Sequence, residues 1–177
     1  LVIKRPTFSF SEKCKIESHI AKVIISFYFC EKFNAMNTIR IGQGYDVHAL
    51  APGLPMWLCG IRIPSETGFV AHSDGDVAIH ALCDALLGAL ALGDIGLHFP
   101  DNSDEFKGID SKILLRRVMD MVSEKGYSIG NVDITIALQS PKLRPHIDAM
   151  RKCLAKVIGC NVACVSVKAT TTERLGF

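Results

Sequence analysis

The sequence predicts one α/β (α+β) domain, in which a mixed β-sheet is packed on one face by helices. Two observations favour this class: helix-like and strand-like hydrophobic patterns are interspersed along the chain, and no internal repeat or low-complexity tract interrupts them. A third is size, because 177 residues with 49% hydrophobic and 21% charged side chains suffice for one domain with a sizeable core.

The first regular elements follow residue 39. Residues 39–48 (IRIGQGYDVH) predict a strand that leaves through glycines, and residues 56–65 (MWLCGIRIPS) predict a second strand ended by a proline. Residues 75–92 then predict a helix, for which Ser73 or Asp74 is available as the N-cap.

The second half of the chain continues the mixture. An amphipathic helix is expected to begin at Asp110 or Ser111 and to end at Gly126. Residues 131–139 alternate between apolar and polar and predict a half-buried strand. Residues 145–158 predict a third helix, and the alternation that follows it at Val165, Val167 and Ala169 predicts the last strand.

Residues 1–35 differ in composition from the remainder and show no clear helical or strand period. Three interpretations stay open: a targeting segment, translation that starts at Met36, or an added docking element. A start at Met36 is favoured over targeting because the segment holds three Glu residues, and transit peptides are poor in acids. We therefore expect residues 36–177 to be the functional domain and residues 1–35 to be an extension of uncertain status.

Charge and cysteine content limit the expected partners and compartment. The net charge is +2, and the basic excess falls in the first 35 residues. A nucleic-acid site needs a clustered basic face, and a membrane helix needs about 18 or more apolar residues in a row, so we expect neither partner. Seven scattered cysteines favour a reducing compartment, the bacterial cytoplasm, with a plastid possible if the first residues are a targeting segment.

Polar side chains within an otherwise apolar helix give the first indication of chemistry. Asp76, His80 and Asp84 recur every four residues among Ala, Val, Ile and Leu, so they share one stripe of the helix. Buried carboxylates and imidazoles need partners, because their burial alone costs several kcal/mol. The stripe fits either a core histidine held by a flanking aspartate or a metal ligand with acidic neighbours.

Asp46 and His48 shift the balance towards a metal. Their side chains point to the same side of an extended strand, because they are two residues apart. Together with His80 they form an Asp-His-His set of the kind that Zn²⁺ accepts. Three protein ligands leave a fourth position open, which is typical of catalytic zinc sites.

Three further segments favour a phosphorylated substrate. Residues 72–76 (HSDGD) precede a helix N-terminus, where phosphate binds well, although an ordinary capping loop would look the same. Residues 168–173 (KATTTE) offer consecutive hydroxyls and a carboxylate suited to Mg²⁺ on a diphosphate. Residues 139–146 form a proline-bounded loop that could hold a base or serve as a plain connection. The residues thus indicate a metal-dependent enzyme that acts on a phosphorylated or diphosphate substrate.

Four motifs carry a resemblance to a known family. They are RIGQGYDVHAL, AHSDGDVAIHALCDALLGALALGDIGLHFPD, GNVDITI and VKATTTERLGF, and together they run from Arg40 to Phe177. In this combination the chain resembles the 2-C-methyl-D-erythritol 2,4-cyclodiphosphate synthase family, lyases of the non-mevalonate isoprenoid (terpenoid) pathway. The resemblance implies conversion of 4-diphosphocytidyl-2-C-methyl-D-erythritol 2-phosphate to the 2,4-cyclodiphosphate plus CMP.

The resemblance also implies an assembly and its cofactors. The assembly is a homotrimer around a central β-prism, with active sites at subunit interfaces. Zn²⁺ would be held by Asp46, His48 and His80, and Mg²⁺ or Mn²⁺ on the diphosphate by Glu173. Members of the family continue past LGF to a final strand, so residues 36–177 are expected to lack their last C-terminal strand.

His72 and Thr171 match the catalytic residues of the family. Its methylerythritol phosphate pocket and its cytidine pocket account for most of the remaining matches. The substrate-binding residues that the resemblance implies are Asp46, His48, His72, Ser73, Asp94, Ile95, Gly96, Phe99, Pro100, Asp101, Asn102, Ser103, Leu138, Gln139, Ser140, Pro141, Lys142, Leu143, Arg144, Thr170, Thr171, Thr172, Glu173 and Phe177.

Two other functions use the same residues. A zinc-dependent phosphohydrolase of nucleotide diphosphates would place water in the open metal position and would incorporate solvent oxygen into its product. A metal-stabilised ligand-binding protein would have no activity to lose when its metal is removed.

Overall fold

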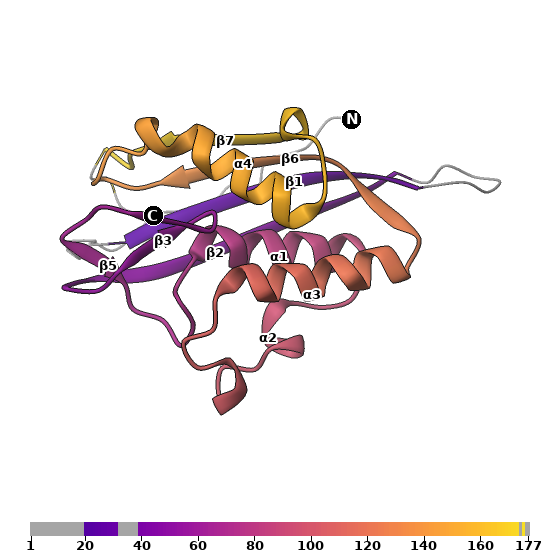
Figure 1. Cartoon of the computed structure of the whole chain (residues 1–177), viewed down its shortest axis with the longest axis horizontal. Helices are drawn as coiled ribbons and strands as arrows, with labels where there is room; N and C mark the ends of the chain where they lie inside the picture. The colour runs from indigo at the N-terminus through magenta and orange to yellow at the C-terminus, as the bar shows by residue number, and fades with distance from the viewer. Residues whose placement is uncertain (1–19, 32–38, 174, 176–177) are drawn as a thin grey trace, which may run out of the picture.

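A computed structural model describes residues 20–31, 39–173 and 175 of the chain (Figure 1). Its main sheet has five strands in the order β5-β2-β1-β6-β7. Every neighbouring pair in it is antiparallel except β6 and β7, which are parallel, so the sheet is mixed, as the sequence predicts. The strands of this sheet are β1 (Ile20–Glu31), β2 (Arg40–Pro52), β5 (Thr67–Phe69), β6 (Tyr127–Ala137) and β7 (Val165–Thr170).

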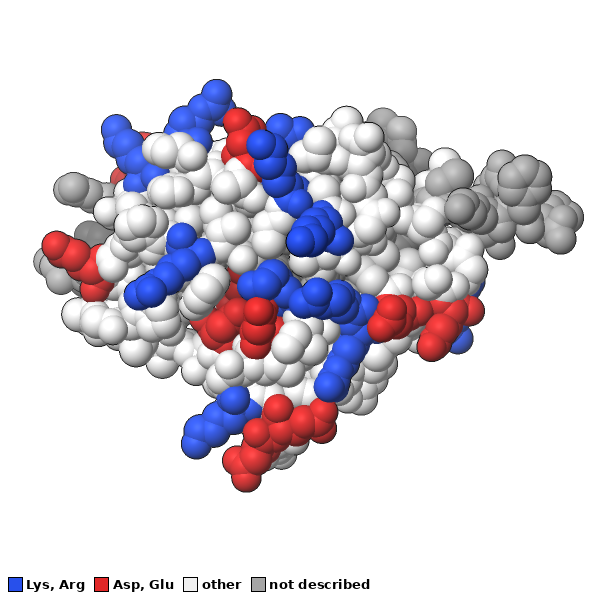
Figure 2. Space-filling view, in the orientation of Figure 1, with Lys and Arg blue, Asp and Glu red and all other residues white. Residues whose placement is uncertain are grey.

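Helices α1, α3 and α4 lie against one face of this sheet (Figure 1). The α-helices are α1 (Val77–Ala89), α2 (Ile95–His98), α3 (Ser111–Glu124) and α4 (Ile147–Ile158), and the short 3-10 turns are η1 (Asp104–Phe106), η2 (Arg144–His146) and η3 (Val162–Cys164). Among the described residues, no helix has both the length and the apolarity to cross a membrane. Over the face shown in Figure 2, basic and acidic side chains are interspersed.

The segment expected to form one strand at residues 56–65 is instead a hairpin of β3 (Met56–Leu58) and β4 (Ile61–Ile63). Its two turn residues, Cys59 and Gly60, both have positive φ angles, of 53° and 79°. Two consecutive left-handed residues are what a tight hairpin turn requires, and a cysteine in the first position hides that signal.

Strand β1 occupies the centre of the main sheet, although its sequence shows no strand period. It pairs with β2 from Ile20↔Ala49 to Phe29↔Arg40 and with β6 from Lys22↔Ala137 to Glu31↔Tyr127. The extension of residues 1–35 therefore contributes the strand that joins the two halves of the sheet. The rest of that extension lies outside the described residues.

Helix α1 packs on β2 with almost no space between the two backbones. A Cβ atom placed on Gly44 would lie 1.8 Å from the carbonyl oxygen of Ala81, and one on Gly42 would lie 1.9 Å from that of Ala85. Only glycine permits this approach, because any side chain would overlap the helix backbone. The close packing brings His80 of α1 next to the end of β2 that carries Asp46 and His48.

We predict that Gly44→Ala lowers the free energy of unfolding by about 3 kcal/mol or more, since the added methyl must push the helix off the strand. Gly88→Ala, on the exposed side of the same helix, is the matched control, because a Cβ there meets nothing within 4 Å. It should stabilise the chain by about 0.5–1 kcal/mol through helix propensity. Urea unfolding of both variants measures the difference, and equal stabilities would contradict the close packing.

Candidate metal centre and phosphate site

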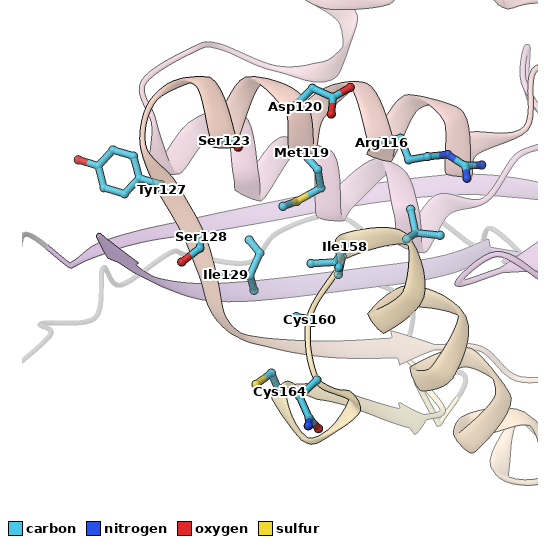
Figure 3. Close-up of a pocket in the computed structure, with 13 residues that line it drawn as sticks. Arg116, Met119, Asp120, Ser123, Tyr127, Ser128, Ile129, Ile158, Cys160 and Cys164 are labelled. Atoms are coloured by element: carbon cyan, nitrogen blue, oxygen red, sulfur yellow. The ribbon is translucent and has the colours of Figure 1, made fainter. Parts of the chain in front are cut away.

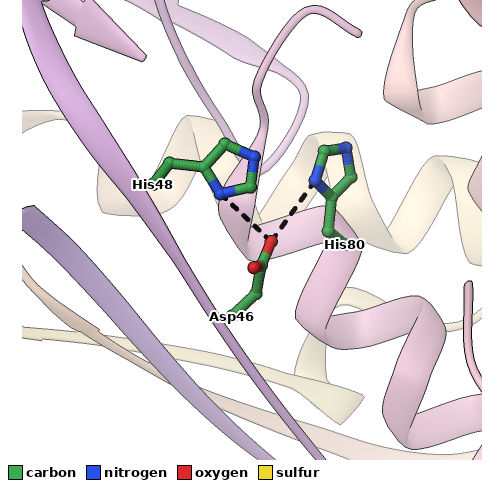
Figure 4. Close-up of side chains that lie close together, drawn as sticks. All are labelled: Asp46, His48 and His80. Carbon is green, nitrogen blue, oxygen red and sulfur yellow. Dashed lines mark ion pairs between the residues drawn. The ribbon is translucent and has the colours of Figure 1, made fainter. Parts of the chain in front are cut away.

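Asp46, His48 and His80 converge at one point between strand β2 and helix α1 (Figure 4). Asp46 Oδ2 lies 3.2 Å from His48 Nδ1 and 3.3 Å from His80 Nδ1. One ligand atom of each residue lies within 4.8 Å of the others. The structure thus confirms that the Asp-His-His set predicted from sequence can hold a metal.

The donor atoms of this cluster fit a small cation. Ligands about 2.0–2.1 Å from a tetrahedral zinc ion are about 3.3–3.4 Å apart, which agrees with the two distances to Asp46. His48 Nδ1 is buried, and apart from the Asp46 carboxylate at 3.2 Å it has no hydrogen-bond partner, so it can serve as a ligand atom. Burial lowers the pKa of His48, opposed by the neighbouring Asp46 carboxylate, and this favours the neutral ring that binds metals.

A second set of groups contacts the far side of the His80 ring. His80 Nε2 lies 2.9 Å from Ser111 Oγ and 3.1 Å from Ser73 Oγ. Ser111 Oγ in turn lies 2.5 Å from Asp74 Oδ1. The sequence predicted Ser111 only as a possible first residue of a helix, and its side chain shows nothing locally of a role at His80.

Asp76 is the N-cap of α1, so the expectation of Ser73 or Asp74 in that role is wrong. Its fully buried carboxylate accepts hydrogen bonds from the backbone N–H groups of Cys59, Gly60 and Ile79, at 2.9, 2.6 and 3.0 Å. Burial raises the pKa of Asp76 to about 6, opposed by those hydrogen bonds. This carboxylate caps the first turn of α1, and a phosphate site at residues 72–76 stays a prediction.

The three polar residues of the α1 stripe therefore have separate roles. Asp76 fastens the β3–β4 turn to the start of the helix, and His80 faces Asp46. Asp84 accepts a hydrogen bond of 2.7 Å from the backbone N–H of Ile95 and so fixes the start of α2. The stripe supplies one candidate metal ligand, and its two carboxylates support the surrounding loops.

Hydrogen bonds join the expected methylerythritol phosphate loops to α1 and to the segment before it. His72 Nε2 is 3.1 Å from the backbone oxygen of Ser103, which ties the HSDGD segment to the loop of residues 99–103. Asp94 caps α2 by accepting from Leu97 N. Phe99 is buried in the core, whereas the loop residues Pro100, Asp101 and Asn102 are exposed and Ser103 is half-buried.

The KATTTE segment and the expected cytidine loop form a second cluster at the ends of β6 and β7. Leu138 N donates to Thr170 O at 2.9 Å, and Gln139 Nε2 donates to Thr172 Oγ1 at 2.7 Å. The Thr171 hydroxyl donates to the Glu173 carboxylate.

The expected cytidine loop, residues 138–144, has both buried and exposed side chains. Those of Leu138 and Leu143 are buried in the core, and that of Pro141 is half-buried. The exposed side chains are those of Gln139, Ser140, Lys142 and Arg144. Phe177 lies outside the described residues.

The metal cluster and the KATTTE cluster lie at the same end of the sheet but on different strands. The pairings His48↔Ala21, Lys22↔Ala137 and Ala137↔Thr170 lead from β2 across β1 and β6 to β7. Three strand spacings separate the two clusters by about 14 Å. Within one chain, the structure does not bring them together around one small ligand.

A pocket of about 520 Å³ lies at the opposite end of β6, away from both clusters (Figure 3). Residues of α3, the start of β6 and the loop after α4 line it, among them Asp120, Tyr127 and Cys164. It includes none of the residues that the sequence predicts for the site.

The fold and the site together define a class: an α/β protein whose Asp46, His48 and His80 form a cluster that could hold a metal ion. Comparison with known proteins is more specific. The chain belongs to the YgbB family, whose model matches residues 39–177.

Several relatives support this assignment. The 2-C-methyl-D-erythritol 2,4-cyclodiphosphate synthase of Mannheimia succiniciproducens is 63% identical over 139 residues, which cover 78% of this chain and 87% of that protein. The synthase of Thioalkalivibrio sulfidiphilus is 63% identical over 142 residues, which cover 80% of this chain and 89% of that protein. The resemblance carried by the sequence motifs is thus confirmed, and the activity is that of a cyclodiphosphate synthase, a lyase of the non-mevalonate isoprenoid pathway.

Solved structures agree with the fold. A 2C-methyl-D-erythritol-2,4-cyclodiphosphate synthase in a CDP-bound form superposes with a TM-score of 0.69 at 35% identity, covering 88% of this chain and 90% of that chain. IspF of Plasmodium falciparum in a CDP complex superposes with a TM-score of 0.69 at 37% identity, covering 80% and 87%. The mixed α/β architecture expected from the sequence is confirmed.

Proposed function

We propose that the chain performs its cyclisation with a Zn²⁺ ion held by Asp46, His48 and His80. In 4-diphosphocytidyl-2-C-methyl-D-erythritol 2-phosphate, an oxygen of the 2-phosphate attacks the β-phosphorus, the bond from that phosphorus to the bridging oxygen breaks, and CMP leaves with that oxygen. The observation that carries the proposal is the convergence of three ligand atoms around one point, where the buried His48 Nδ1 has no partner besides the Asp46 carboxylate.

The protein's part in this step is to position phosphates and to offset their charge. Phosphoryl transfer within one molecule needs no protein nucleophile, and zinc would supply positive charge beside the β-phosphate. His72, fixed against Ser103, and Ser73, beside His80, would orient the reacting phosphates. Loop residues 94–96 and 99–103 would surround the methylerythritol unit.

We place the cytidine unit and the second cation at the other cluster. Solved relatives are described with CDP, and residues 138–144 together with Thr170 would hold the base. Leu138 and Leu143 are buried, so their backbone groups would make those contacts. Glu173, oriented by Thr171, would hold Mg²⁺ or Mn²⁺ on the diphosphate.

A homotrimer around a central β-prism would unite the two clusters at each subunit interface. The separation of about 14 Å between them within one sheet favours a site completed by a neighbouring copy. The face of the sheet opposite the helices also needs a cover, since Ile41, Tyr45 and Val47 of β2 are 60%, 50% and 42% exposed there. Three such faces packed together would form the prism.

The working unit would be residues 36–177 together with the central strand β1. Cys59, Cys83, Cys153, Cys160 and Cys164 are free thiols, and the curated relatives are bacterial, so we place the protein in a reducing bacterial cytoplasm.

A ³¹P NMR time course tests the proposed function. The full chain is incubated with its diphosphocytidyl substrate, Zn²⁺ and Mg²⁺, in H₂¹⁸O. Cyclic diphosphate and CMP without ¹⁸O are the expected products, because the attacking oxygen belongs to the substrate. A linear product that contains ¹⁸O would show that the chain catalyses hydrolysis and not cyclisation. The absence of any turnover would favour a ligand-binding protein.

We expect Glu173→Gln to lower Mg²⁺-dependent turnover roughly 100-fold, since it removes the charge that holds the second cation. Zinc content should be unchanged, because Glu173 lies on the other cluster. Titration of activity with Mg²⁺ measures the effect, with Glu66→Gln in an exposed loop as the matched control. An unaltered Mg²⁺ response would remove Glu173 from this role.

A further inference from the structure

His80 contacts its surroundings through both ring nitrogens. Nδ1 faces Asp46 on the metal side at 3.3 Å, whereas Nε2 faces Ser111 at 2.9 Å. Ser111 is the first residue of α3, it is 0% exposed, and the N-cap of that helix is its neighbour Asp110. The Ser111 hydroxyl is therefore not needed to cap α3 and is directed at the histidine.

The hydrogens of this chain of contacts can be assigned by counting donors. The Asp74 carboxylate only accepts: Oδ1 takes Ser111 Oγ at 2.5 Å and Asp76 N at 3.1 Å, and Oδ2 takes Ser111 N at 3.0 Å. Ser111 Oγ has a single proton, which is donated to Asp74. Its oxygen must then accept from His80, so Nε2 carries a hydrogen and Nδ1 of the neutral ring presents its lone pair to Asp46 and His48.

The Ser73 hydroxyl does not fix the tautomer of His80. Its Oγ lies 3.1 Å from His80 Nε2 and accepts the backbone N–H of Gly75 at 3.2 Å. The hydroxyl proton of Ser73 has no fixed acceptor, so Ser73 can donate to His80 Nε2 or accept from it, according to the tautomer of the ring. Of the two hydroxyls at Nε2, only Ser111 is held in one orientation by a carboxylate.

We propose that Asp74 and Ser111 are positioning residues of the metal centre, which fix His80 as the Nε2–H tautomer and aim Nδ1 at the cation. The inference rests on the zinc site of the proposed function and adds to it two residues that contact neither the metal nor the substrate. Because Asp74 N also donates to Ile109 O at 3.0 Å, the same residues join the start of α3 to the HSDGD segment. The orientation of a metal ligand is thereby set from a third element of the fold.

Zinc affinity and the Nε2–H proton test the proposal on the full chain. Competition with a chromophoric chelator should show that Ser111→Ala weakens zinc binding about 10- to 100-fold. Asp74→Asn should weaken it by a similar factor. The double variant should bind zinc with the same affinity as the single variant that binds it less tightly, because both substitutions break one chain of hydrogen bonds.

Nuclear magnetic resonance of ¹⁵N-histidine in the zinc-loaded chain supplies a readout that a merely structural role would not move. The wild type should show a protected Nε2–H of His80, Ser111→Ala should lose that protection, and Ser73→Ala, the matched control, should keep both it and the zinc affinity. Ser111→Ala with unchanged affinity and a protected Nε2–H would overturn the positioning role. A wild-type chain that binds no zinc would instead overturn the proposed metal site.

Discussion

His80→Ala will abolish binding of the proposed Zn²⁺ and reduce formation of the cyclic diphosphate by roughly 1,000-fold or more. The substitution removes one of three converging candidate ligands, and two protein ligands are too few for a tetrahedral zinc site. His48→Ala should act alike, because each imidazole lies against the same oxygen of Asp46. The losses of activity should not add in the His48→Ala/His80→Ala double variant, because either substitution alone prevents metal binding.

Metal content by mass spectrometry and turnover by ³¹P NMR measure this effect on the same preparation. Lys125→Ala is the control, because that exposed side chain follows the last residue of α3 and lies next to the start of β6, at the opposite end of that strand from the second cluster. It should keep zinc and activity. Turnover that persists in a zinc-free His80→Ala protein would exclude the metal from the reaction.

A chain that begins at Met36 will fail to give a cooperatively folded protein. Strand β1 supplies hydrogen bonds to β2 on one side and to β6 on the other, so its loss leaves two unpaired edges inside the sheet. The metal centre would lose its support as well, because Asp46 pairs with Val23 and His48 with Ala21. Aggregation or a broad, noncooperative unfolding transition is the expected outcome.

Circular dichroism and thermal unfolding of two truncations test the role of β1. A chain that begins at residue 18 keeps the strand and should unfold cooperatively, whereas the chain from Met36 should not. If both truncations unfold at the same temperature, the strand contributes nothing to the fold, and the extension can be removed.

The cluster of candidate metal ligands could be predicted from the sequence because the evidence for it is local. Alternation places Asp46 and His48 on one side of a strand, and an apolar helix makes His80 conspicuous. The partner of His80 could not be predicted, since Ser111 lies 31 residues further along and behaves locally as an ordinary helix start.

Strand β1 and the hairpin were missed for different physical reasons. The place of β1 depends on β2 and β6, and its pairing with β6 involves residues about a hundred positions away, which no local pattern contains. The hairpin depends on a left-handed Cys59, a conformation that its residue type does not favour. Asp76 was assigned to the right helix, but its burial beneath the turn at Cys59 follows from tertiary packing.

The contact of Gly42 and Gly44 with α1 would also affect which ions the proposed metal centre accepts. Two of the candidate metal ligands lie on β2 and one lies on α1. The space between the three ligand atoms therefore depends on the distance between the strand and the helix, which are already in contact. A larger ion such as Ca²⁺, with ligands at about 2.3–2.6 Å and a need for six or more, would have to spread these elements apart. At the proposed zinc site the two glycines would thus confer selectivity by ionic radius without contacting the ion.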